Sequence, residues 1–159
     1  MIKGFITNLG KYNEGELIGE WIDFPIDEDA MEEVFKRIEI NDQYEEYFFT
    51  DWECRFETGL GEYVSIEEVN ELAEMLETED ADIFEAIIEA TGYDLRTAID
   101  HTDRASFFSG SSLMDLAYEF VDQMELPEMA RTYFDYEAFA RDLEIEGYTE
   151  VSGGVICVD

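Results

Sequence analysis

Apolar and polar positions in the first third of the chain follow the patterns of short strands and one helix. Residues 2–7 and 17–24 have strand-like patterns, and the segment between them predicts a hairpin with a long loop. Beyond Asp27, apolar residues at helical spacing predict a short helix, and residues 47–56 predict a further strand. The first third is therefore expected to form a small α+β lobe that ends near the glycines of residues 58–61. The helical apolar residues are Met31, Val34, Phe35 and Ile38.

From Ser65 onward the apolar spacing becomes mostly helical. Ser65 and Glu68 have the spacing of a capping box at the start of one helix, and a second helix is expected to end at Gly92. A third helix is expected to begin near Ser112, and a fourth precedes a closing hairpin within residues 148–158. The predicted inner faces are, in chain order, Ile66, Val69, Leu72, Ala73 and Leu76; Ile83, Phe84, Ile87 and Ile88; Leu113, Leu116, Ala117, Phe120, Val121 and Met124; and Tyr136, Phe139, Ala140 and Leu143.

These elements predict an α+β fold built from three small lobes. The expected boundaries give an N-terminal α+β lobe (residues 1–62), a helical middle lobe (63–108) and a C-terminal α+β lobe (109–159). With 46% hydrophobic residues, the 159-residue chain is too apolar to be a disordered polyelectrolyte. Its 12 Phe, 9 Tyr and 2 Trp residues supply large apolar side chains, which suit thin or elongated lobes.

The net charge changes this picture most. The chain has 42 acidic and 9 basic residues, a formal charge of −33, and the three predicted lobes carry −12, −11 and −10. Self-repulsion of this size destabilises a compact state, so it indicates a compensating advantage. A partner with a strongly positive surface is the natural candidate. Nucleic acid and the anionic surface of a membrane are not expected as partners.

The carboxylates of the predicted helices fall opposite the apolar stripes, at spacings of three and four residues. Like charges at this spacing destabilise a helix by about 0.2–0.5 kcal/mol per pair. Solvated helix faces explain any one such set, but the repetition favours a surface that resembles DNA, since 42 carboxylates match the charge of roughly two turns of duplex. The candidate phosphate-mimicking residues are Glu67, Glu71, Glu74, Asp82, Glu85, Glu89, Asp115, Glu119 and Asp122.

Other chemistry finds little support in the sequence. Residues 27–29 and 80–82 begin like calcium loops but lack the required glycine and the bidentate glutamate. His101 is the only histidine and is interpreted as a surface cap. We therefore expect no catalytic residues, no metal and no cofactor. Cys54 and Cys157 are expected to be reduced thiols in a cytoplasmic protein, because the sequence has no signal peptide or membrane-spanning run.

Several segments, in order along the chain, resemble the ArdA family of antirestriction proteins. They are residues 8–17 (NLGKYNEGEL), 21, 24–27 (FPID), 41–47 (NDQYEEY), 65–70 (SIEEVN) and 133–143 (YFDYEAFARDL). The resemblance implies an elongated three-lobed α+β molecule that is dimeric through its C-terminal lobe. It also implies a protein from a conjugative plasmid or transposon that imitates bent duplex DNA and occupies the DNA groove of type I restriction-modification enzymes.

Two alternatives belong to other classes. An ordinary protein adapted to high salt would also have many surface acids and few lysines. Such a protein should unfold in dilute buffer, whereas a DNA mimic should stay folded there. A metal-dependent enzyme is the third option, and it has the least support because no carboxylate pair among so many is distinctive.

Overall fold

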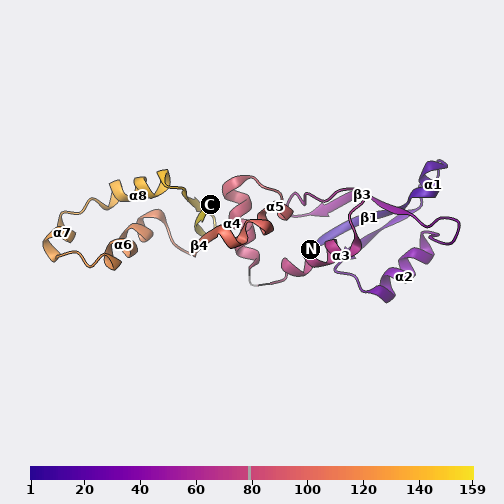
Figure 1. The fold of residues 1–159 in the computed structure, drawn as a ribbon, viewed down its shortest axis with the longest axis horizontal. Helices are drawn as coiled ribbons and strands as arrows, with labels where there is room; N and C mark the ends of the chain where they lie inside the picture. The colour runs from indigo at the N-terminus through magenta and orange to yellow at the C-terminus, as the bar shows by residue number, and fades with distance from the viewer. Residues whose placement is uncertain (79) are drawn as a thin grey trace. The chain divides into compact units, whose positions relative to one another are not determined.

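The computed structural model describes residues 1–78 and 80–159 and has two three-stranded antiparallel sheets with helices (Figure 1). This confirms the predicted α+β fold class. The chain divides into two compact units. Unit 1 comprises residues 1–81 with 94–96, and unit 2 comprises residues 82–93 with 97–159. The division into three lobes stays a prediction.

The sheet of unit 1 forms as the strand pattern predicts. Strands β1 (Ile2–Asn8), β2 (Gly19–Phe24) and β3 (Tyr47–Cys54) lie in the order β2-β1-β3. The loop of the predicted hairpin contains a short helix that the pattern did not predict, α1 (Leu9–Asn13). The register between β1 and β3 shifts between Phe5 and Ile6, where the ladder is irregular.

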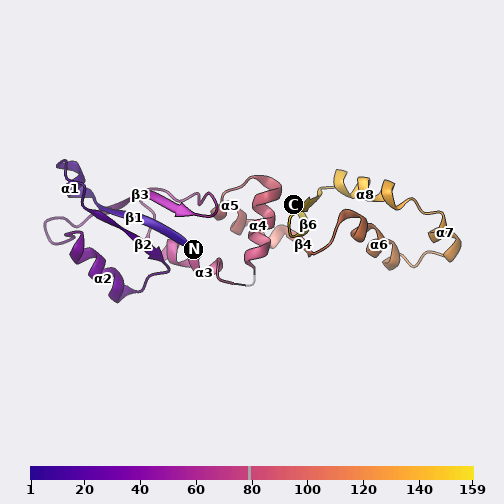
Figure 2. The same ribbon diagram turned by 180° about the vertical axis from the view of Figure 1, so that it is seen from behind.

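Two longer helices complete unit 1, and Figures 1 and 2 place both on the same side of the sheet. Helix α2 (Glu28–Arg37) begins where Asp27 accepts a hydrogen bond from the backbone N–H of Ala30 at 2.7 Å. Helix α3 (Ile66–Met75) begins in the same way, with Ser65 accepting from the N–H of Glu68 at 3.2 Å. Both helices therefore start at the predicted caps. Their buried residues are Met31 and Val34 in α2 and Val69, Leu72 and Ala73 in α3.

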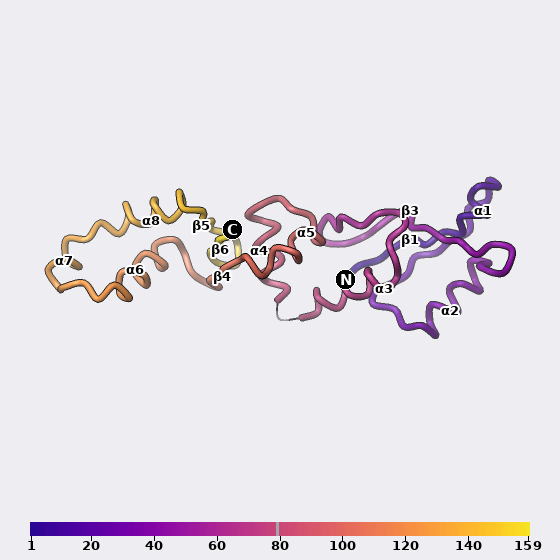
Figure 3. The backbone as a smooth tube through the Cα atoms, in the orientation of Figure 1, coloured from indigo at the N-terminus to yellow at the C-terminus, as the bar shows by residue number. Residues whose placement is uncertain are grey.

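Unit 2 is built around the second sheet. Strands β4 (Ala105–Ser109), β5 (Tyr148–Val151) and β6 (Gly154–Val158) lie in the order β4-β6-β5, and Figure 3 shows the C-terminus beside β4. The predicted closing hairpin is the pair β5 and β6. The pattern did not predict β4, and the expected boundary between residues 108 and 109 falls inside this strand.

Helices lie before and between these strands. Helix α4 (Ala81–Thr91) ends at Gly92, as predicted, and φ of Gly92 is +75°, a left-handed conformation that glycine adopts without strain. The remaining helical segments are α5 (Leu95–Asp100), the 3₁₀ helix η1 (Thr102–Arg104), α6 (Leu113–Gln123), α7 (Glu128–Thr132) and α8 (Tyr136–Ile145). Met124, predicted on the inner face of the third helix, is instead 51% exposed, because it lies one residue beyond the end of α6.

Adjacent residues of β6 divide the core of unit 2 into two layers. Val155 packs with Leu116 and Ala117 of α6 and with residues of α8, whereas Ile156 packs with Ala86 and Ile87 of α4. Successive side chains of a strand point to opposite faces of the sheet. Helix α4 therefore covers one face of this sheet, and α6 and α8 cover the other.

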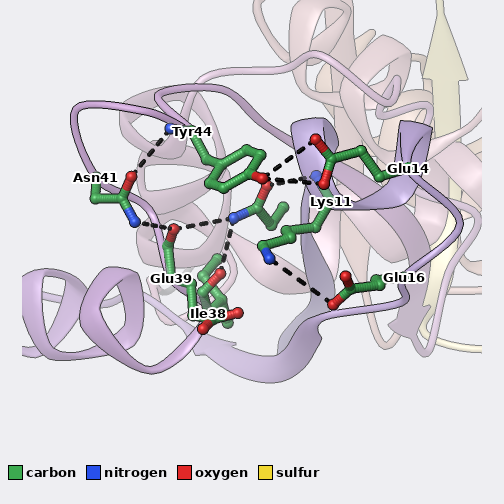
Figure 4. A network of polar contacts seen from close by, with 8 residues as sticks. Lys11, Glu14, Glu16, Ile38, Glu39, Asn41 and Tyr44 are labelled. Atoms are coloured by element: carbon green, nitrogen blue, oxygen red, sulfur yellow. Dashed lines mark hydrogen bonds and ion pairs between the residues drawn. The ribbon is translucent and has the colours of Figure 1, made fainter.

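A buried asparagine, Asn8, connects the loops at one end of the first sheet. Figure 4 labels its partners Lys11, Ile38 and Glu39. Asn8 is fully buried. Its Nδ2 atom donates hydrogen bonds to the carbonyls of Ile38 and Glu39 at 3.0 and 3.1 Å. Its Oδ1 atom accepts from the N–H of Lys11 at 3.0 Å and so caps α1. Glu39 has φ of +63°, which is unfavourable for a residue with a Cβ. The hydrogen bond from Asn8 helps to hold this turn.

Tyr44 completes the network at the surface. Its hydroxyl donates to the Glu14 carboxylate at 2.9 Å, which raises the pKa of Tyr44, as burial does to a smaller extent. The ammonium of Lys11 lies 4.8 Å from the centre of the Tyr44 ring, and Asn41 accepts from the N–H of Tyr44 at 3.1 Å. Residues 8–17 and 41–47, two of the segments that resemble the family, are thus in direct contact.

We predict that Asn8→Ala lowers the free energy of unfolding by about 2–3 kcal/mol, because it leaves two carbonyls and one N–H without their buried partner. Tyr44→Phe is the matched control, since it removes an exposed hydrogen bond and should cost less than about 1 kcal/mol. Urea unfolding of both variants measures the difference. Equal losses would contradict the structural role assigned to Asn8.

Candidate partner-binding surface

The three predicted carboxylates of α3 lie on its solvent side. Glu67, Glu71 and Glu74 are all exposed, and the buried side of the helix lies behind them. Burial raises the pKa of Tyr47 in β3, and the charge of Glu67 raises it further, which shows that this carboxylate lies near the start of β3. Glu68 forms an ion pair with Arg96 instead of completing the predicted capping box.

The carboxylates of α4 line a cleft in unit 2. Asp82, Glu85 and Glu89 are exposed, and together with residues of β4 and the turn between β5 and β6 they enclose about 340 Å³. Glu89 accepts hydrogen bonds from the backbone N–H and the hydroxyl of Ser152, each at 3.0 Å. This carboxylate therefore joins α4 to the β5–β6 turn while it also faces solvent.

Two of the three carboxylates of α6 have local partners. Asp115 and Ser112 form a capping box, in which Asp115 accepts from the N–H of Ser112 at 2.9 Å. This bond, and a further one with the Ser112 hydroxyl, lower the pKa of Asp115 below its ordinary value of 3.8. Asp122 forms an ion pair with Arg131. The charge of Asp122 is therefore compensated by a basic side chain, while Glu119 is exposed on the same helix.

The nine predicted carboxylates are divided between the two compact units. Those of α3 belong to unit 1, and those of α4 and α6 belong to unit 2. Within unit 2, α4 and α6 pack on opposite faces of the sheet, so their carboxylates lie on different sides of it. The acidic surface of this unit is therefore displayed on two sides.

The charge extends beyond the predicted residues. Unit 1 contains 25 acidic and 6 basic residues and unit 2 contains 17 and 3, which gives −19 and −14. In the described part of the chain, no charged residue is buried. The prediction omitted exposed carboxylates of α2 and α8, although the same helical spacing identifies them. These are Glu28, Asp29, Glu32 and Glu33 in α2, and Glu137, Asp142 and Glu144 in α8.

The sequence offers one histidine and two cysteines for other chemistry, and the surroundings of all three are described by the structure. The Nδ1 atom of His101 lies 2.8 Å from the carbonyl of Thr97 near the end of α5, which confirms its interpretation as a cap. Cys54 and Cys157 are half-buried free thiols, and burial raises the pKa of Cys157. Over residues 1–78 and 80–159, no three His, Cys, Asp or Glu side chains form a group that could hold a metal ion. None of the described helices is long and apolar enough to cross a membrane.

These features define an acidic α+β protein that presents carboxylates from helices packed on two small sheets. The family model of the antirestriction protein ArdA matches residues 4–157, so the chain belongs to the ArdA family of antirestriction proteins. No curated protein sequence matches the chain. Family membership supports an antirestriction function and an interaction with restriction enzymes.

We predict that Ser112→Ala moves the titration midpoint of Asp115 upward, because the variant removes the hydroxyl half of the capping box. A lowered pKa in the folded state means that the Asp115 contribution to stability is present above its ordinary pKa. This contribution is lost as the pH falls through the lower, folded value. The ¹³Cγ shift of Asp115 reports the midpoint in both proteins.

Ser65→Ala is the matched control for this titration. It removes the cap of α3 in the other unit and should leave the midpoint of Asp115 unchanged. An unchanged midpoint in Ser112→Ala would show that the Ser112 hydroxyl does not help to lower the pKa of Asp115.

Proposed function

We propose that the protein is a non-catalytic DNA mimic that occupies the DNA-binding groove of type I restriction-modification enzymes. It would bind their methyltransferase core in the cytoplasm and prevent restriction of incoming DNA, with modification blocked through the same groove. The observation that carries this proposal is the exposure of all nine predicted carboxylates on the outer faces of α3, α4 and α6.

The carboxylates of unit 2 lie on both sides of its sheet, which suits a partner that contacts its ligand from several sides. Duplex DNA presents phosphates around its whole circumference, and a DNA-binding groove contacts several sides of it. Carboxylates on both sides of the β4-β6-β5 sheet can likewise contact opposite walls of a basic groove. Binding would release the ions held by each surface, and affinity would fall as salt concentration rises.

The roles within each helix are distinct in this proposal. Glu67, Glu71, Glu74, Asp82 and Glu119 are exposed and would contact basic side chains of the enzyme directly. Asp115 and Glu89 are exposed as well, but each also receives backbone hydrogen bonds that fix its position. Fixed carboxylates lose less conformational freedom on binding, which favours affinity.

We further propose that the protein is a homodimer through its C-terminal lobe. In unit 2, large apolar side chains of α6, α7 and α8 and their connections are exposed to solvent. Tyr133 is 83% exposed, and a second copy could cover it. Interaction surfaces are enriched in aromatic residues and methionine. The exposed residues are Tyr118, Met124, Met129, Tyr133 and Ile145.

We predict that a triple variant of α3, with Glu67, Glu71 and Glu74 each changed to Gln, weakens inhibition of the restriction enzyme by about tenfold or more. Each single change should cost about 0.2–1 kcal/mol, because exposed ion pairs contribute little individually. Gln preserves helix propensity, so the fold should be retained. Inhibition constants measured at 50 and 200 mM salt should differ at least tenfold for the unchanged protein.

The control for net charge is a triple variant of α2, in which Glu28, Asp29 and Glu32 become Gln, Asn and Gln. It makes the same change in net charge on another exposed helix. Equal losses in the two triple variants would contradict a specific role for the α3 face. Unfolding of the unchanged protein in dilute buffer, or inhibition that is independent of salt, would instead favour adaptation to high salt.

We predict that Tyr133→Glu makes the protein monomeric, because it places a charge within the proposed apolar interface. Sedimentation at several protein concentrations measures the change. Tyr63→Glu is the matched control, since Tyr63 is also highly exposed, at 72%, but belongs to unit 1. A dimer that persists in Tyr133→Glu, or is lost only in Tyr63→Glu, would contradict the proposed interface.

A further inference from the structure

One face of the sheet in unit 1 remains open to solvent. The pairing register places Ile2, Gly4 and Ile6 on one face, and these residues are buried. Alternate residues of β1 and their cross-strand partners point to the opposite face. We call this opposite surface the aromatic-acidic face, and it comprises Lys3 and Phe5 of β1, Trp21 and Asp23 of β2, and Asp51 and Glu53 of β3.

An exposed tryptophan lies at the β2 end of one row of this face. Trp21 is 44% exposed and pairs in register with Phe5, whose other partner is Asp51. The two aromatic rings meet edge to face, with centroids 5.4 Å apart and an interplanar angle of 76°. This contact holds the indole against the sheet while one side of it faces solvent. Exposed, well-supported tryptophans contribute strongly to protein interfaces.

Carboxylates share this face with the aromatic pair. The adjacent row contains Asp23, Lys3 and Glu53, in register across the three strands. The Lys3 ammonium lies 3.7 Å from the Asp23 carboxylate, and both Asp51 and Glu53 are exposed. The aromatic-acidic face thus carries three carboxylates and one ammonium, a net charge of −2, beside the aromatic pair.

We propose that the aromatic-acidic face binds an arginine side chain of a basic protein segment. A planar guanidinium can stack on the indole of Trp21, while the carboxylates of the same face attract its charge. An ammonium lacks the planar stacking surface and the fixed fork of donors. The face therefore selects arginine over lysine.

Charge argues against nucleic acid and anionic lipid, because a chain of net charge −33 would repel both. The homodimer proposed above is formed through unit 2, so it does not occupy this face of unit 1. A basic protein segment is attracted by the same field. None of these residues belongs to the nine carboxylates of the proposed DNA-mimicking surface, so this inference does not depend on that function.

The test is a titration of the full-length, ¹⁵N-labelled protein with a hexa-arginine peptide and, separately, with a hexalysine peptide. We expect the arginine peptide to shift the indole N–H resonance of Trp21 and the amide of Asp51, and to bind about fivefold more tightly than the lysine peptide. Trp21→Phe should retain most of this preference, and Trp21→Thr should abolish it. Threonine suits an exposed edge strand, so the fold should persist.

Two controls separate stacking from general attraction between opposite charges. Tyr63→Thr removes a more exposed aromatic side chain that lies outside the aromatic-acidic face and should leave the preference for arginine unchanged. The pair Asp51→Asn and Glu53→Gln should weaken arginine binding more than Glu28→Gln and Asp29→Asn, although the net charge changes equally. Equal affinities for the two peptides, or no effect of Trp21→Thr, would overturn the proposal. Because the restriction enzyme is absent, this result is independent of the inhibition measurements.

Discussion

Repulsion among 42 carboxylates is the constraint on which the rest of the structure depends. Salt bridges do little to offset it, because only nine basic residues exist and the pairs described are at the surface. Apolar packing must therefore supply the stability. Each helix that presents carboxylates has a buried stripe behind it, such as Val69, Leu72 and Ala73 in α3 or Phe84, Ala86 and Ile87 in α4. The charged helix faces are thus held in place by apolar packing on the buried side of each helix rather than by partners of opposite charge.

The same constraint explains how the helices begin. Asp27, Ser65, Ser112 and Asp135 each accept a hydrogen bond from the first turn of α2, α3, α6 and α8. An acidic residue in a first turn interacts favourably with the helix dipole, whereas one in a last turn does not. A helix rich in carboxylates therefore gains stability when it has both an N-terminal cap and acidic residues in its first turn. Helix α2 has both, and it also has the basic residues Lys36 and Arg37 in its last turn.

Much of the fold could be predicted from the sequence because its signals are local. The caps at Asp27, Ser65 and Ser112, the stop at Gly92 and the closing hairpin follow from neighbouring residues, and so does the outward orientation of the nine carboxylates. Strand β4 was missed because a five-residue edge strand is specified by its pairing with β6, which is distant in sequence. The ion pairs of Asp122 with Arg131 and of Glu68 with Arg96 were missed for a similar reason. In both pairs the partners are separated in the sequence, and the fold brings them together. The two-sided display in unit 2 depends on Val155 and Ile156 facing different helices, which no helical spacing reveals.

The central claim is that this antirestriction protein acts by taking the place of DNA. Its most direct test is displacement of a fluorescently labelled duplex from the methyltransferase core of a type I restriction-modification enzyme, followed by anisotropy while the protein is added. Competitive occupancy predicts complete release of the duplex, with the midpoint moving upward in proportion to the DNA concentration. Inhibition of the enzyme while the duplex remains bound would contradict it.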